Sequence, residues 1–395
     1  MVNKEKIKDL LTRGVEEIID REHLKKRLLT GEKLRVKLGI DPTTPNLHLG
    51  NSVTFLKLRD FQELGHQVVL ILGDFTAQIG DPSDKLQKRP FLSPEEVKKN
   101  VQGYKKQTGK ILEIDKVEWH YNSEWLNKLS LIEFTRLADL ISVQQVLHRR
   151  NFKERWKREE EITIRELYYP LYQGYDSVAV KANLEIGGTD QLFNLLVGRK
   201  IQETYRQTPQ DIMTLQMLEG LDGEKMSKTR KNTINIFDSP DEQYGKIMSM
   251  RDNLIVKYFT LCTRVPFKEI NEMVEVMNKD TNPRDFKAKL AFEIVKMYHG
   301  EKVAQKAEKE FNKIFRQKEL PSKMPSYKLR AKSIKITDLL VEIKLAPSKS
   351  EARRLIQQDA VKIDGKIEKD WQKEIEIKRG MIIQVGKRKF IRLDT

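Results

Sequence analysis

The most constraining feature of this sequence is a pair of apolar runs separated by one helical pattern. The runs span residues 34–40 and 67–74, and the second is almost continuously apolar. Such a run is typical of a strand buried on both faces of a parallel sheet. Between the runs, residues 41–46 are rich in residues that break regular structure, and residues 47–64 have apolar residues at helical spacing. The pattern predicts a strand–helix–strand unit of an α/β fold.

The start of the predicted helix is a candidate phosphate-binding site. Asn46 is a suitable N-cap, which places His48 and Asn51 in the first turn on one side of the helix. A helix N-terminus carries unpaired N–H groups and positive dipole, which suits a polyphosphate. Gly50 lies between them and lets a flat ring approach the backbone. The pattern indicates ATP with its adenine over Gly50, although a surface histidine near a helix cap would show the same residues.

Composition indicates several domains and a polyanionic partner. A chain of 395 residues is longer than a single hydrophobic core usually accommodates, so we expect several domains. Its formal net charge of +16 makes nucleic acid the first candidate partner. The single cysteine, Cys262, excludes an internal disulfide and a cysteine-based metal cluster, and it fits a reducing cytoplasm. Because no apolar run reaches 18 residues, we expect no membrane span, and we expect a cytoplasmic protein.

Further polar loops follow the predicted strands, where ligands of parallel sheets collect. In the loop after residue 74, Asp81 could accept from an amine, while Lys85 and Arg89 could meet phosphates; an ordinary turn would also contain these residues. A second strand, turn and helix is expected at residues 182–196. The two glycines of its turn, the second of which is Gly188, permit close approach of a ligand to the backbone. Its acidic residue, Asp190, suits ribose hydroxyls.

A third loop follows a predicted strand at residues 213–218. It contains two lysines three residues apart, followed by a threonine, after a flexible Asp-Gly turn: Lys225, Lys228 and Thr229. These side chains could close on a triphosphate and neutralise the charge that grows on leaving pyrophosphate. A basic surface loop alone would carry the same residues, so the argument depends on three such loops from one sheet.

A polar stripe is predicted on another helix. Tyr169, Gln173 and Asp176 are spaced i, i+4, i+7, which places a phenol, an amide and a carboxylate on one face. Pro170 would lie near the first turn, where proline is tolerated. An aromatic stripe is usually core, but a core stripe would not alternate with Gln and Asp. The stripe therefore suits a small ligand with cationic and hydroxyl groups.

The remaining segments are predicted in outline. Residues 1–33 have one apolar face and predict helices, and residues 91–165 are helical and increasingly charged. Their part near 120–165 is either an oligomer surface or a solvated helix face. Residues 240–316 are again helical, and a Pro-containing linker follows. From residue 331 onward the chain has 16 Lys/Arg against 10 Asp/Glu, with two helices and an Asp-Gly hairpin.

Together these motifs resemble a known family. The segment Asp41-Pro42-Thr43 through His48-Leu49-Gly50-Asn51 resembles the first signature of class I aminoacyl-tRNA synthetases, and Lys225-Met226-Ser227-Lys228-Thr229 resembles the second. The segments at residues 80–83, 169–176 and 187–191 are similar to those of bacterial tyrosyl-tRNA synthetases, in particular their second bacterial subtype. The resemblance covers nearly the whole chain, and five motifs in order make it highly specific.

The resemblance implies a role for each matching residue. The reaction would activate L-tyrosine with ATP to tyrosyl-adenylate and pyrophosphate, and then transfer tyrosine to the 3′ end of tRNA(Tyr). The implied catalytic residues are His48, Asn51, Lys225, Lys228 and Thr229. The implied ATP-binding residues are Gly39, Asp41, Thr43, His48, Gly50, Asn51, Lys85, Arg89, Gly188, Asp190, Lys225 and Lys228. The implied tyrosine-binding residues are Lys37, Asp81, Tyr169, Gln173, Asp176 and Gln191.

The sequence departs from the family pattern at a few positions. Asn51 replaces the more common histidine but can still donate. Many bacterial members have a tyrosine at the position of Lys37, and that tyrosine gives the substrate phenol a second hydrogen-bond partner. Without it, discrimination against phenylalanine depends more on Asp176. Asp84 replaces a small residue.

The resemblance also implies the domain plan and the partners. We expect a Rossmann-type parallel-sheet catalytic domain at 1–239 with a helical insertion near 120–165, and a helical anticodon-recognition domain at 240–318. A linker at 319–330 and a small α+β RNA-binding domain at 331–395 would follow, with phosphate contacts from Lys349, Arg353 and Arg354. ATP would bring Mg²⁺, with no metal held by the protein, and a homodimer is the family expectation.

Three other functions compete with tyrosine activation. A tryptophanyl relative shares both signatures, but an indole offers no hydroxyl to Asp176. A non-catalytic RNA-binding paralogue would have no need of Lys225, Lys228, Asp81 and Asp190. A small-molecule nucleotidylyltransferase would not need the long basic carboxyl-terminal chain. These features favour the tyrosine enzyme.

Overall fold

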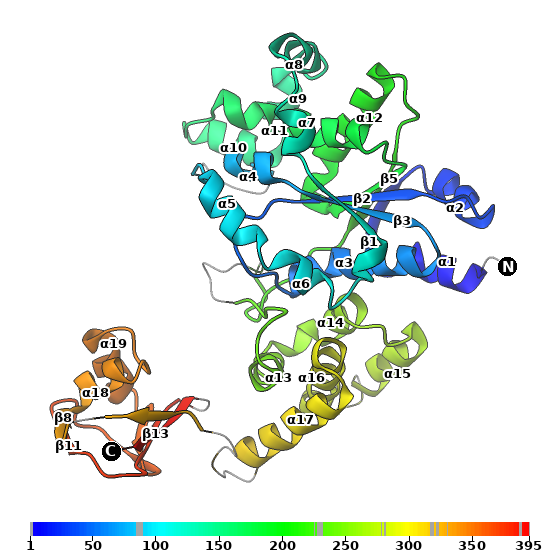
Figure 1. The fold of residues 1–395 in the computed structure, drawn as a ribbon. Helices are drawn as coiled ribbons and strands as arrows, with labels where there is room; N and C mark the ends of the chain where they lie inside the picture. The colour runs from blue at the N-terminus through cyan, green and yellow to red at the C-terminus, as the bar shows by residue number, and fades with distance from the viewer. Residues whose placement is uncertain are drawn as a thin grey trace. The chain divides into compact units, whose positions relative to one another are not determined.

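The computed structural model describes two compact units, residues 1–308 and 309–395. Residues 3–83, 90–224, 226, 232–277, 279, 282–316, 320, 324–329, 331–386 and 389–394 are described. Each unit is treated by itself. The first carries a six-stranded sheet and many helices, and the second is a small α+β unit (Figure 1).

The sheet of the first unit has the strand order β1-β6-β5-β2-β3-β4. Its strands are β1 (Val15–Ile19), β2 (Arg35–Ile40), β3 (Gln67–Leu72), β4 (Val117–Tyr121), β5 (Leu184–Gly188) and β6 (Asp211–Leu215). All neighbours are parallel except β1 and β6. Residues 68–72 of β3 are all buried, as a central parallel strand requires. The predicted α/β class is confirmed.

Helices cover both faces of this sheet. In Figure 1, α3 lies on one face with α1, while α11 and α12 lie on the other. The sequence-adjacent helices α11 and α12 also pack against each other. The helices are α1 (Lys4–Leu10), α2 (Arg21–Leu29), α3 (Leu49–Glu63), α4 (Asp74–Ile79), α5 (Pro94–Val101), α6 (Tyr104–Thr108), α7 (Ser123–Leu126), α8 (Leu131–Ala138), α9 (Val143–Leu147), α10 (Arg150–Lys157), α11 (Ile164–Ala179) and α12 (Leu192–Thr204).

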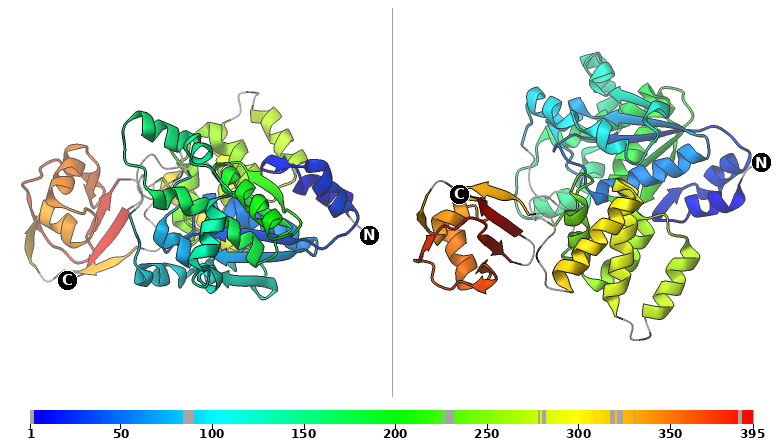
Figure 2. Two further views of the ribbon diagram at one scale, coloured as in Figure 1. Left: turned by 90° about the horizontal axis from the view of Figure 1, so that it is seen from above. Right: turned by 60° about the horizontal axis from the view of Figure 1, so that its bottom comes forward.

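A helical region follows the sheet, as predicted. It contains α13 (Pro240–Met248), α14 (Ile255–Cys262), α15 (Phe267–Met277), α16 (Pro283–His299) and α17 (Glu301–Phe315). The helices α13 and α14 both pack on α16 (Figure 2), whose apolar face is fully buried at Leu290, Ala291, Ile294 and Val295. In the described part of the chain, short 3-10 helices occur at Ile114–Lys116, Thr189–Gln191 and Asp252–Leu254.

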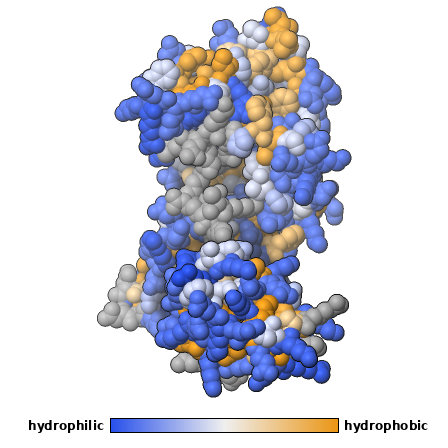
Figure 3. Space-filling view, turned by 90° about the vertical axis from the view of Figure 1, so that its left-hand side faces the viewer, coloured by the Kyte–Doolittle hydropathy of each residue, from blue (hydrophilic) through white to orange (hydrophobic). Residues whose placement is uncertain are grey.

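The second unit has its own apolar core. The face of this unit that is seen in the lower part of Figure 3 is mainly hydrophilic. The strands β10-β9-β12-β13-β7 form one sheet, and β11 and β8 form another. The predicted hairpin is confirmed: Asp364 and Gly365 both have positive φ between β9 and β10. Its elements are β7 (Ser326–Lys328), β8 (Ser333–Lys335), α18 (Ile336–Glu342), α19 (Lys349–Gln357), β9 (Val361–Ile363), β10 (Lys366–Ile367), β11 (Glu374–Glu376), β12 (Ile382–Val385) and β13 (Lys389–Asp394).

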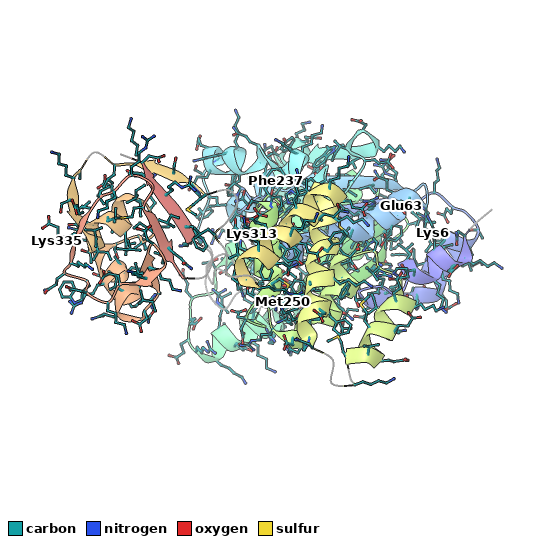
Figure 4. All side chains as sticks on the ribbon, turned by 90° about the horizontal axis from the view of Figure 1, so that it is seen from below. Lys6, Glu63, Phe237, Met250, Lys313 and Lys335 are labelled. Carbon is teal, nitrogen blue, oxygen red and sulfur yellow. The ribbon has the colours of Figure 1, made fainter. Side chains whose placement is uncertain are left out.

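Two predicted helical stretches contain strands. Within residues 3–33, residues 15–19 form the edge strand β1 because they pair with β6, and only α1 and α2 are helical. In Figure 4, Lys6 of α1 lies beside Glu63 of α3, with an Nζ–Oε2 distance of 3.7 Å. Within residues 91–165, residues 117–121 form β4 through pairing with β3. Five residues are too few for periodicity to separate strand from helix, so tertiary pairing decides.

Three smaller expectations also need correction. Pro170 lies inside α11 rather than in its first turn, where its missing N–H removes one helical hydrogen bond. The strand expected at 213–218 is β6 at 211–215, because residues 211–215 are the ones that pair with β5. The strand expected at 182–186 begins two residues later and includes both glycines, Gly187 and Gly188.

Candidate active site

A cavity of about 320 Å³ lies at the carboxyl ends of the parallel strands. Its wall contains residues that follow β2, β3 and β6, the end of β5, and the first turn of α3. This is the place where parallel sheets bind ligands, because the loops that follow neighbouring strands meet there. The cavity is therefore the candidate site.

The cavity brings together most of the residues predicted to bind ATP and tyrosine. They are Gly39, Asp41, Thr43, His48, Gly50, Asn51, Asp81, Tyr169, Gln173, Asp176, Gly188, Asp190 and Gln191. Lys37 does not line it. Five predicted residues lie outside the described residues: Lys85, Arg89, Lys225, Lys228 and Thr229. Lys349, Arg353 and Arg354 belong to the second unit.

The first turn of α3 is held by a cap that differs from the predicted one. The N-cap is His48 rather than Asn46, because the backbone around His48 stays extended and forms a bridge with Asn235. The N–H of His48 donates to Oδ1 of Asn51 at 3.1 Å. A Cβ at Gly50 would lie 2.9 Å from Nδ1 of His48. Glycine is therefore needed here to make room for the imidazole itself.

Asp41 follows β2, and its carboxylate accepts a hydrogen bond from each of two side chains. The hydroxyl of Tyr169 donates to its Oδ2 at 2.8 Å, and the hydroxyl of Thr76 donates to its Oδ1 at 2.6 Å. Burial raises the pKa of Tyr169 well above its usual range, and the Asp41 carboxylate adds to the shift. Tyr169 therefore stays a neutral donor at physiological pH. Gly39, two residues earlier on β2, has open space where a Cβ would lie, which leaves room for a ligand.

A polar network joins Asp81 to the helices beside it. Gln191 donates from Nε2 to Oδ2 of Asp81 at 2.7 Å, and the N–H and hydroxyl of Ser83 donate to Oδ1. The Nδ2 of Asn194 lies 2.9 Å from Oε1 of Gln173 and 3.0 Å from Oε1 of Gln191. Asn194 was missed by sequence reasoning, although its place one helical turn after Gln191 was a usable signal.

Asp176 is buried at the cavity wall and receives two donors. Nε1 of Trp125 donates to Oδ1 at 2.8 Å, and Nδ2 of Asn122 lies 3.4 Å from Oδ2. Burial raises the pKa of Asp176 to about 7, against the opposing effects of Lys37, Trp125 and Asn122. Asn122 lies between β4 and α7 and Trp125 lies in α7, and no pattern in the sequence marked either donor.

Lys37 lies behind the cavity wall, on the strand next to Glu185. Its ammonium Nζ is 2.9 Å from Oε1 of Glu185, and both side chains are buried. Glu185 lines the cavity, whereas Lys37 does not. Sequence reasoning noted Glu185 only as part of a strand, because the pairing of Lys37 with Glu185 across β2 and β5 requires the sheet register.

Asp190 and Gly188 lie at the end of β5, as predicted from the second strand–turn–helix motif. Burial raises the pKa of Asp190, and the nearby carboxylate of Asp81 adds to this effect. A carboxyl that is partly desolvated gains from hydrogen-bonding to hydroxyl donors. The arrangement suits a ribose at this edge.

No three His, Cys, Asp or Glu side chains among the described residues gather closely enough to hold a metal ion. None of the helices in the described part of the chain is long and apolar enough to cross a membrane.

Comparison with known proteins decides the family. The family model "tRNA synthetases class I (W and Y)" matches residues 29–316, and a model of the SYY-like C-terminal domain of tyrosine–tRNA ligase matches residues 316–393. The chain is 48% identical to the tyrosine–tRNA ligase of Thermotoga maritima over 395 residues, which is 100% of this chain and 98% of that protein. The chain belongs to the tyrosine–tRNA ligases of the class I synthetase family.

Other members of the family agree. The tyrosine–tRNA ligase of Moorella thermoacetica is 47% identical over 98% of this chain and 95% of its own length. The solved structure of a C-terminally truncated mitochondrial tyrosyl-tRNA synthetase of Aspergillus nidulans superposes with a TM-score of 0.66. It covers 78% of this chain and 94% of its own, and at 24% identity it shows the fold alone. The predicted resemblance is confirmed, and this chain is an aminoacyl-tRNA synthetase.

Proposed function

We propose that this tyrosine–tRNA ligase performs both of its steps at the cavity described above. The tyrosine carboxylate attacks the α-phosphate of ATP, which yields tyrosyl-adenylate and pyrophosphate. A ribose hydroxyl at the 3′ end of tRNA(Tyr) then takes the tyrosyl group. The observation that carries the proposal is that one cavity is lined by the helix N-terminus with His48 and Asn51 and by the buried carboxylate of Asp176. The protein contributes positioning and charge stabilisation.

The phosphate side is built on the first turn of α3. Asn51 uses Oδ1 to accept from the N–H of His48, so its Nδ2 can donate to a phosphate oxygen. The imidazole of His48 supplies a further donor, and the positive end of the α3 dipole favours negative charge there. In this proposal Lys85, Arg89, Lys225, Lys228 and Thr229 complete the phosphate site, and Mg²⁺ arrives with ATP as part of the substrate.

The amino-acid side is built on α11 and the loop after α4. Asp81, Tyr169 and Gln173 would receive the ammonium, and Gln191 would donate to the carboxylate. Gln191 already donates to Asp81, so one amide can couple the two groups of the substrate. Asp176 would accept the phenol hydroxyl. Gly39, Asp41, Thr43, Gly50, Gly188 and Asp190 would hold the adenosine.

We also assign tRNA binding to the parts beyond the sheet. The helical domain at 240–318 would recognise the anticodon, and the domain at 331–395, after the linker at 319–330, would hold RNA phosphates. Three basic side chains on α19 are exposed: Lys349, Arg353 and Arg354. Lys349 is paired with Asp338 and Arg354 with Glu351. Exposed pairs of this kind contribute little, so phosphates can replace them.

A homodimer in the cytoplasm completes the proposal. Exposed apolar side chains gather in the insertion near 120–165, where Leu131 is 87% exposed and Trp156 is 67% exposed. Hydrophobic residues lie at the top of Figure 3, where Figure 1 places α8. Patches of this kind mark interaction sites. Light scattering should give twice the chain mass, and a Leu131→Glu, Ile132→Glu variant should give one chain mass.

Amino-acid-dependent exchange of labelled pyrophosphate into ATP tests the chemistry. The enzyme is assayed with tyrosine, phenylalanine and tryptophan, in wild type and in Asp176→Asn. Exchange with tyrosine alone, lost in the variant, is expected. Exchange with tryptophan would contradict the substrate, and folded protein without any exchange would favour an RNA-binding paralogue.

A further inference from the structure

The strongest unexplained feature is a fully buried ion pair beside the cavity. The side chain of Lys37 is 0% exposed and that of Glu185 is 1% exposed, with Nζ and Oε1 separated by 2.9 Å. They face each other on the neighbouring parallel strands β2 and β5. A buried pair loses hydration that its attraction only partly repays, and apolar residues of equal volume are often as stable. Stability alone therefore does not explain this pair.

The ammonium of Lys37 is also bound to the helix that carries Asp176. It donates to the hydroxyl of Ser177 at 2.8 Å and to the backbone carbonyl of Gln173 at 3.1 Å. These residues lie immediately after Asp176 and three residues before it on α11. The three donor contacts of Lys37 thus tie β2 and β5 to the turn of α11 that presents Asp176.

Among the described residues, Lys37 is the cation that lowers the pKa of Asp176. Asp176 and Glu185 are two buried carboxylates, and Lys37 is the cation placed between their elements. Like charges in a buried site resist joint ionisation, so without a cation the pair would retain a proton. A protonated Asp176 would be a poorer acceptor for the hydroxyl of tyrosine. A protonated carboxyl would also cost less to leave unpaired against the ring of phenylalanine, so discrimination between the two amino acids would be weaker.

We propose that Lys37 is a positioning residue for the choice of tyrosine: its ammonium, held by Glu185, Ser177 and the Gln173 carbonyl, favours the ionised, hydrogen-bond-accepting form of Asp176 without touching the substrate. This inference rests on the proposed role of Asp176. It differs from direct contact of Lys37 with tyrosine, because Lys37 lies outside the cavity wall.

The electrostatics around Asp176 agree with this role. Burial is the largest effect and raises the pKa of Asp176 to about 7, and Lys37 is the largest effect that lowers it. Glu185 acts in the other direction but more weakly. In the described part of the chain, the ionisable groups that act on Asp176 are Lys37 from β2, Glu185 from β5 and Tyr169 from α11 itself, whereas Trp125 and Asn122 add uncharged donors.

A charge-neutral double variant tests the proposal. Lys37→Met with Glu185→Gln removes the ion pair without leaving a buried charge unpaired. Pyrophosphate exchange with tyrosine and with phenylalanine is measured from pH 6 to 9, beside thermal unfolding. We expect wild-type-like unfolding, a higher KM for tyrosine with kcat less affected, and a tyrosine-to-phenylalanine ratio of kcat/KM about tenfold lower, as a one-unit pKa change would give. The pH midpoint of kcat/KM for tyrosine should move upward.

Glu185→Gln alone is the matched second variant. It removes the negative charge paired with Lys37 and leaves Asp176 as the nearby buried carboxylate on which Lys37 acts, so the pH midpoint should move downward instead. Midpoints and selectivity equal to wild type in the folded double variant would overturn the proposal and leave the pair a structural one. If the double variant fails to fold, an unchanged or raised midpoint in Glu185→Gln overturns it. Absence of tyrosine-dependent exchange in wild type would instead overturn the proposed function.

Discussion

The indole Nε1 of Trp125 donates a hydrogen bond of 2.8 Å to Oδ1 of Asp176, across 51 residues of chain. Trp125 lies in α7, which follows the edge strand β4, and Asp176 lies in α11. The ring of Trp125 packs against a small apolar cluster that includes Val69 and Ile71 of β3. The sheet therefore fixes the donor, and the donor orients the carboxylate that we assign to the phenol.

Removing this donor should weaken tyrosine selection. In Trp125→Phe the ring contacts remain but Asp176 loses its shortest hydrogen bond. We expect KM for tyrosine in pyrophosphate exchange to rise about tenfold, the order expected for one hydrogen bond to a charged group. The KM for phenylalanine in the same assay should change little. The matched control is Trp119→Phe on β4, because the indole nitrogen of Trp119 has no hydrogen-bond partner among the described residues. Equal effects of the two substitutions would contradict the prediction.

Asp176 should also leave a signature in the pH dependence of stability. Its pKa is raised from an ordinary value of 3.8 to about 7, so its contribution to folding is fully present below about pH 4 and is lost as the pH rises through about 7. Asp176→Asn has no such loss. Its free energy of unfolding, relative to wild type, should rise between pH 4 and pH 8 by roughly 4 kcal/mol at most, since three pKa units correspond to that amount. Urea unfolding across this range measures it, and a constant difference would refute the assignment.

The two uses of Asn51 can be separated by substitution. Asn51→Ala removes both the oxygen that caps α3 and the proposed phosphate donor. Asn51→Asp keeps an oxygen for the N–H of His48 and replaces the donor with negative charge. We expect kcat of exchange to fall about 100-fold or more in both, as for loss of a transition-state donor, whereas the helix-cap loss of about 1 kcal/mol should appear only in Asn51→Ala. An Asp variant with wild-type kcat would remove Asn51 from the phosphate site.

Binding of tRNA should depend on the basic face of α19. Lys349→Gln with Arg353→Gln removes two exposed positive side chains, one of which lies over the ring of Trp371 at 4.1 Å. The slope of log affinity for tRNA against log salt should flatten by about 1 to 2, as loss of two phosphate contacts predicts. Pyrophosphate exchange without tRNA should be unchanged. Lys378→Gln, an exposed lysine outside α19, is the control. An unchanged slope in the double variant would exclude α19 from the interface.

Much of the fold was predictable because its elements follow from local sequence patterns, such as continuous apolar runs and turn residues. The apolar run at 67–74 identified β3, and the Asp364-Gly365 turn identified the hairpin of the second unit. The predictions that failed were those for short segments. Residues 15–19 and 117–121 have no periodicity strong enough to overcome helical neighbours, and they become strands only because β6 and β3 offer edges to pair with.

The sequence by itself determined which residues could carry the chemistry, and the tertiary structure decided what surrounds them. The spacing of Tyr169, Gln173 and Asp176 is a local property of one helix, so it could be read directly. The donors Trp125 and Asn122 and the ion pair of Lys37 with Glu185 come from elements that are distant in the chain. No sequence period relates them, because strand register and helix packing alone bring them together. Those contacts set the charge of Asp176, and so only the fold decides how a carboxylate chosen by the sequence behaves.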